Sequence, residues 1–165
     1  CSDLPPPTAA PGTLGDLWCW AESQESTLIS PAMFAEFVLP YLQRVTERFG
    51  LVYYGCCEPL TDRLELILAA MPNLRSVSVT PWADLERTAE LLGDRYVCSR
   101  KPDPVPLSGA RPHWDRARAD LQRTYEAARR GECNVELLFR DVYDVGGDRT
   151  RLRTWTELAR SVFEM

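Results

Sequence analysis

The chain has 165 residues, of which 45% are hydrophobic and 26% are charged, with 19 basic and 24 acidic side chains and a net charge of −5. These fractions exclude a disordered or collagenous chain, and no apolar run approaches the roughly 18 residues that a membrane span requires. The mild acidity argues against nucleic acid or a membrane as the main partner, because both favour a basic face. The basic residues are 18 Arg and one Lys, a bias that we attribute to genomic codon usage.

The length suits one domain of average size. A complete (β/α)₈ barrel takes about 250 residues, so any barrel formed by this chain is partial. Residues 1–16, CSDLPPPTAAPGTLGD, are rich in Pro, Gly and small residues and predict a flexible arm. Residues 17–165 carry regular apolar patterns and are interpreted as the folded region.

Strand-like and helical patterns alternate along the folded region. The predicted strands are residues 18–22, 51–57, 74–80, 95–100 and 134–145. The predicted helices are residues 31–49 with a kink at Pro40, 62–71, 84–92, 111–130, and a last helix that follows Asp148. This alternation predicts an α/β fold with about five parallel βα units, either doubly wound or part of a barrel. The chain contains neither GxGxxG nor GxxxxGK[ST], the two phosphate-binding fingerprints of nucleotide-binding sheets.

The six cysteines are interpreted as reduced thiols rather than a disulfide framework. Four of them lie in or beside apolar, strand-like runs, which is typical of buried thiols. Adjacent Cys56 and Cys57 are expected to point to opposite faces of a strand, which suits reduced thiols better. We therefore expect a cytoplasmic protein.

Polar and reactive side chains follow the predicted strands. In parallel α/β proteins the active site lies beyond the carboxyl ends of the strands. The candidates at these ends are Glu22, Gln24, Glu25, Cys56, Glu58, Trp82, Arg100, Arg140 and Asp141. Lys101 also follows a predicted strand, and we interpret it, taken singly, as a polar strand end.

Two of these segments indicate specific chemistry. Glu22 and Glu25 bracket two polar residues, and two nearby carboxylates can differ in pKa and act as an acid and a base. A solvated loop before a helix is the alternative interpretation. Cys56 beside Glu58 indicates a zinc ligand or a nucleophile, because the thiolate serves as both. Cys56, Glu58 and Cys98 supply the three ligands of a catalytic zinc only if the fold brings them together.

Three segments carry a family resemblance: SPAMFAEFVLPYLQRVTERFGLVYYGCCEPL, MPNLRSVSVTPWADLERTAELLGDRYVCSRKPDP and GECNVELLFRDVYDVGGDRTRLRTWTELAR. Together, over roughly residues 14–163, they resemble the C-terminal half of the uroporphyrinogen decarboxylase superfamily, which also contains cobalamin- and thiol-dependent methyltransferases. The resemblance implies a partial TIM-like (β/α)₈ barrel with the cleft at the carboxyl ends of its strands. This chain would then supply about five of the eight units.

The resemblance favours a zinc- and thiol-dependent, corrinoid-linked methyltransferase acting on a thiol methyl acceptor. In that branch a His-x-Cys motif and a later Cys hold zinc; here Cys56 takes the place of the cysteine and Tyr54 that of the histidine. The catalytic residues would be Glu22, Glu25, Cys56 and Asp141, the substrate-binding residues Gln24, Trp82, Arg100 and Arg140, and the zinc ligands Cys56, Glu58 and Cys98.

Two alternatives remain open. The first is a carbon–carbon lyase of the decarboxylase type that acts on a tetrapyrrole and needs no cofactor. The decarboxylase branch has a histidine-bearing loop after its C-terminal strand, where this chain has Arg140 and Asp141. The second is a non-catalytic partial barrel that pairs with the missing N-terminal half, with a partner chain or with a second copy as a homodimer.

Overall fold

The computed structural model describes residues 12–140 and 142–164, which form an α/β fold. The strands are β1 (Trp18–Ala21), β2 (Leu51–Tyr54), β3 (Leu74–Val79), β4 (Val97–Arg100) and β5 (Asn134–Leu137). The helices are α1 (Pro31–Phe37), α2 (Leu39–Thr46), α3 (Leu64–Ala70), α4 (Leu85–Leu92), α5 (Trp114–Arg130) and α6 (Thr150–Phe163). Residues 1–11 of the predicted flexible arm lie outside the described residues, and its end forms a short 3₁₀-helix, Leu14–Asp16.

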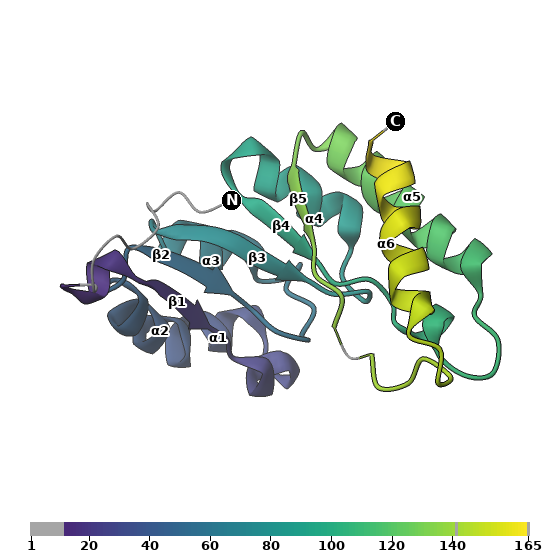
Figure 1. Cartoon of the computed structure of the whole chain (residues 1–165). Coiled ribbons are helices and arrows are strands. Elements are labelled where there is room, and N and C mark those ends of the chain that lie inside the picture. Colours follow the sequence, from purple (N-terminus) through teal and green to yellow (C-terminus); the bar gives the residue numbers. More distant parts are fainter. Residues whose placement is uncertain (1–11, 141, 165) are drawn as a thin grey trace.

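The five strands form one parallel sheet in which the spatial order, β1-β2-β3-β4-β5, is the order of the chain (Figure 1). A doubly wound sheet reverses its order at one point, whereas a barrel adds each strand on the same side of the last. The predicted partial barrel of five βα units is therefore confirmed, and the doubly wound alternative is excluded. The barrel is not closed, because within the described residues β1 and β5 each pair with one neighbour only.

The helices cover one face of the sheet. Right-handed crossovers that always advance in the same direction place every helix on the same side. Alternate strand residues such as Val52, Tyr54 and Val77 are fully buried in the cluster that contains Phe34 of α1. The other face, called here the inner face, carries Trp18, Trp20, Tyr53, Ser78 and Ser99, and Trp20 is 62% exposed.

Three of the predicted elements whose bounds differ from the observed ones do so for clear local reasons. The predicted strand 51–57 ends at Tyr54, because Gly55 adopts φ +99°, which is incompatible with a strand. The predicted strand 134–145 ends at Leu137, because β5 pairs only with β4, whose last residue lies opposite Leu137. The predicted helix 31–49 is divided at Val38, since Pro40 lacks the N–H of a continuous helix.

A buried ion pair joins the sheet to α5. The Arg100 side chain is 0% exposed and lies on the helix side of β4. It donates to Asp120 Oδ1 at 2.8 Å, to the Lys101 carbonyl at 2.7 Å and to Thr124 Oγ1 at 3.3 Å. A buried guanidinium needs such partners, because an unpaired buried charge costs several kcal/mol.

We expect Asp120→Ala to lower the free energy of unfolding by about 3 kcal/mol, because Arg100 then stays buried without its carboxylate. Urea unfolding of the purified chain measures this change. Glu126→Ala is the matched control, since Glu126 is an exposed residue of the same helix, and it should shift stability by less than about 0.5 kcal/mol. Equal effects of the two substitutions would contradict the anchoring role of the ion pair.

Candidate functional site

A hollow of about 320 Å³ lies on the inner face, towards the carboxyl ends of the strands. It is lined by Trp18, Cys19, Trp20, Tyr53, Lys101, Leu138 and Arg140. Its volume is at the lower end of the range for small-molecule pockets. Its walls are mostly aromatic or aliphatic and include two basic side chains, and an apolar lining with few polar groups is typical of small-molecule sites.

Lys101 reaches the inner face because side chains alternate along the extended chain. Arg100 points to the helix side, so the next residue points to the opposite side. Lys101 is 4% exposed, and its Nζ donates to the Cys56 carbonyl at 2.6 Å and to Ser78 Oγ. Burial lowers the pKa of Lys101, and the positive charge of Arg140 lowers it further.

Arg140 approaches the same place from the segment that follows β5. Its Nη1 lies 2.7 Å from Cys56 Sγ, and its guanidinium lies 6.0 Å from the centre of the Trp20 ring. The Trp20 ring is held by a 3.1 Å hydrogen bond from Nε1 to the Gly55 carbonyl and by an edge contact with Tyr53. Arg140 and Lys101 therefore both contact Cys56, although they come from different strand ends.

The surroundings of Cys56 raise the pKa of its thiol. Burial raises its pKa to about 11; contacts with Glu22 and Cys57 also raise it, and Arg140 lowers it. The Cys56 and Cys57 Sγ atoms lie 3.5 Å apart, so the expectation that they point to opposite faces is wrong. Because β2 ends at Tyr54, both cysteines lie in the turn after the strand, where strand alternation does not apply.

Glu58 is buried beside Cys56. Its Oε2 accepts a 3.0 Å hydrogen bond from the Cys56 backbone N–H, which fixes the turn. Its Oε1 is also buried and has no hydrogen-bond partner among residues 12–140 and 142–164. Glu58 thus shapes the turn that presents the Cys56 carbonyl to Lys101.

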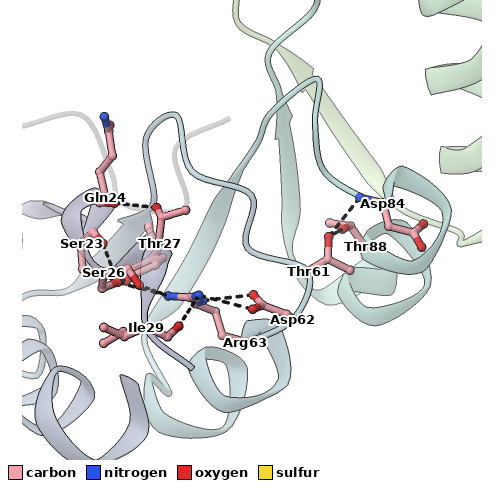
Figure 2. Close-up of polar contacts among 11 residues, drawn as sticks. Ser23, Gln24, Ser26, Thr27, Ile29, Thr61, Asp62, Arg63, Asp84 and Thr88 are labelled. Atoms are coloured by element: carbon pink, nitrogen blue, oxygen red, sulfur yellow. Dashed lines mark hydrogen bonds and ion pairs between the residues drawn. The ribbon is translucent and has the colours of Figure 1, made fainter. Parts of the chain in front are cut away.

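A buried arginine positions the segment after β1 (Figure 2). Arg63 donates to the Ser26 carbonyl at 2.9 Å and to the Ile29 carbonyl at 3.4 Å, and its Nε lies 3.1 Å from Asp62 Oδ1. Ser26 in turn donates to the Ser23 carbonyl at 2.6 Å. These contacts hold a short 3₁₀-helix, Gln24–Leu28, whose Gln24 side chain extends away from the neighbouring side chains in Figure 2.

The structure brings together only part of the predicted site. Cys56, Glu58, Arg140 and Glu22 meet at the turn after β2. Other predicted residues lie elsewhere. Gln24, Glu25 and Trp82 are exposed, Trp82 by 72%. Arg100 pairs with Asp120, and Cys98 is buried in the helix-side core. Asp141 lies outside the described residues.

The predicted zinc ligands do not form one site. Cys98 faces the helices from β4, whereas Cys56 lies in the turn after β2 and contacts Arg140. In the part of the chain that the structure describes, no group of three or more His, Cys, Asp or Glu side chains is placed to hold a metal ion. The donor set of Cys56, Glu58 and Cys98 therefore does not fit a three-ligand catalytic zinc.

Lys101, Ser78 and Tyr53 belong to the site and were not selected from the sequence. Ser78 and Tyr53 lie within strands, where an alternating pattern predicts a face but not its chemistry. Lys101 had one signal of its own, since it is the single lysine beside 18 arginines.

Comparisons with known proteins identify no family for this chain. Neither a scan against models of protein families nor a search of curated proteins found a match. No helix within the described ranges is long and apolar enough to cross a membrane. The structure thus shows an α/β fold with a mostly apolar hollow, beside which Lys101 and Arg140 lie, on its inner face.

Proposed function

We propose that this chain forms the C-terminal part of a barrel enzyme of the uroporphyrinogen decarboxylase superfamily and that its hollow binds a small substrate carrying a carboxylate. The observation that carries this proposal is the convergence of Lys101 and Arg140 on Cys56. Lys101 Nζ lies 2.6 Å from the Cys56 carbonyl oxygen, and Arg140 Nη1 lies 2.7 Å from its sulfur. Two cations beside an aromatic wall suit a carboxylate attached to an apolar body.

The same arrangement favours a carbon–carbon lyase over a methyltransferase. Loss of carbon dioxide leaves an electron pair on the remaining carbon, and a fixed positive charge nearby lowers the energy of that state. The apolar walls strengthen this interaction, because charges interact more strongly where water is excluded. A hollow of about 320 Å³ favours a small acid over a complete tetrapyrrole.

Arg140→Met tests the carboxylate site. We expect the substitution to weaken binding of acetoacetate about ten- to a hundredfold, the range for a hydrogen bond to a charged group. Fluorescence of Trp18 and Trp20, which line the hollow, reports the titration. The substitution should not change the binding of the methyl ester of acetoacetate, which carries no charge. Arg153 is an exposed arginine of α6, and Arg153→Met is the control that should bind acetoacetate like the unsubstituted chain. Equal weakening by both substitutions would overturn the proposal.

Zinc-dependent methyl transfer with a corrinoid partner is the less supported function. It needs three protein ligands for zinc. Cys57, Glu22 and Glu58 lie beside Cys56, but within the described ranges no three such side chains are placed to hold a metal ion.

Metal analysis distinguishes the two functions. Purified chain analysed by elemental mass spectrometry should hold well below one zinc per chain, and Cys56→Ser should leave that content unchanged. Cys133→Ser is the matched control, because Cys133 lies directly before β5 and contacts Cys98. One zinc per chain that is lost in Cys56→Ser alone would reverse our preference and support the methyltransferase.

We also propose that the inner face pairs with further barrel units, supplied by another segment, a partner chain or a second copy. Its support is the exposure of Trp18 (37%) and Trp20 (62%) and the open edges of β1 and β5. Proteins normally cover such edges and aromatic surfaces.

Light scattering during size-exclusion chromatography tests this pairing. The isolated chain should either dimerise or bind a hydrophobic dye strongly, with Trp20→Ser reducing both effects. Trp82→Ser is the control, since Trp82 is exposed but does not line the hollow. A monomer that binds no dye would contradict the proposal.

A further inference from the structure

We propose that Lys101 is a nucleophile that forms an imine with the ketone of a 3-oxo acid bound in the hollow. This inference rests on the carboxylate site proposed above and gives that site its substrate class. Lys101 then forms a covalent bond with the substrate instead of acting as a fixed positive charge.

The composition of the chain supplies the first argument. Lys101 is the only lysine, and the other 18 basic side chains are arginines. A codon bias that favours arginine predicts an arginine here as well. Arginine stays protonated in proteins and cannot act as an amine nucleophile, whereas lysine can lose its proton when buried. The single lysine is 4% exposed and lines the hollow, where a deprotonated amine has a chemical use.

The contacts of Lys101 supply the second argument. Within the described residues its Nζ has two hydrogen-bond acceptors, the Cys56 carbonyl and Ser78 Oγ. A neutral amine has two N–H groups and one lone pair. Two acceptors match the two N–H groups of the neutral form, which keeps its lone pair for a carbonyl carbon, whereas the charged form would also use a cation–π contact with Tyr53. Tyr53, whose ring centre lies 5.8 Å from Nζ, forms an adjacent wall of the hollow.

The surroundings favour the neutral amine. Burial and the positive charge of Arg140 lower the pKa of Lys101, while Cys56, Cys57 and Glu58 act in the opposite direction and the net shift is downwards. Desolvation and a neighbouring cation are the two known ways to activate a lysine nucleophile. Both are present at this position.

The reaction consumes one proton from the solvent, and the water released when the imine forms is taken up again when the imine is hydrolysed. The Nζ lone pair forms a bond to the ketone carbon, the ketone oxygen takes up one proton from the amine and one from the solvent and leaves as water, and a protonated imine results. The bond to the carboxylate then breaks, carbon dioxide leaves, and its electron pair moves towards the imine nitrogen to give an enamine. Protonation of the enamine carbon and addition of water release a ketone and restore Lys101. Arg140 would hold the carboxylate before it leaves.

Borohydride trapping tests the inference. The full chain is incubated with acetoacetate and sodium cyanoborohydride at pH 7.5, and peptides are mapped by mass spectrometry. We expect a reduced adduct on Lys101, formed about tenfold faster than in the urea-denatured chain for each unit by which folding lowers the pKa. Lys101→Arg, with folding checked by circular dichroism, should abolish the adduct at this position.

The outcomes separate this inference from the proposed function. If acetoacetate binds in an Arg140-dependent way but Lys101 reacts no faster in the native than in the denatured chain, the imine is overturned and the carboxylate site stands. If Lys101 reacts rapidly and Arg140→Met changes neither binding nor trapping, the nucleophile stands and the carboxylate site falls. If neither binding nor accelerated trapping occurs, both are overturned.

Discussion

The sheet advances in one direction only, and this constraint arranges the rest of the molecule. Each right-handed crossover adds a parallel strand on the same side and a helix on the same face. One face therefore becomes the apolar core around Phe34, Val52 and Val77, while the inner face stays open. Because the carboxyl ends of parallel strands lie at the same edge, residues distant in sequence meet there on the inner face.

The end of β4 shows how this arrangement divides structural from chemical roles. Arg100 and Lys101 are adjacent, both basic and both buried. Alternation sends Arg100 into the helix layer, where the Asp120 carboxylate neutralises it, and it anchors α5. Lys101 turns to the hollow, where its hydrogen-bond partners are a carbonyl and a hydroxyl instead of a carboxylate. Arg100 is thus paired with a carboxylate on one face, whereas on the other face burial lowers the pKa of Lys101.

The metal site expected at Cys56 is not formed, because its predicted ligands have other places in the fold. Glu58 was expected to bind a metal with it, and in the structure Glu58 fixes the turn through the Cys56 backbone N–H. Cys98 was expected to join them, but it lies on the helix face of β4, opposite to Lys101. Lys101 and Arg140 meet at Cys56 together with the carboxylates of Glu22 and Glu58.

The sequence by itself determined the βα units, their approximate bounds and the strand ends where reactive residues cluster, because apolar periodicity and turn residues are local properties. It selected Cys56, Glu58 and Arg140 for that reason. Only the tertiary structure decided the order of the strands and which residue of a neighbouring pair faces the hollow. Strand alternation depends on where a strand begins and ends, and a single glycine at position 55 shifted that end for β2. The sequence therefore identified Lys101 only as a residue at a strand end. Its place in the site depends on how β2, β3 and β4 lie beside one another, because its partners are Cys56 after β2 and Ser78 of β3.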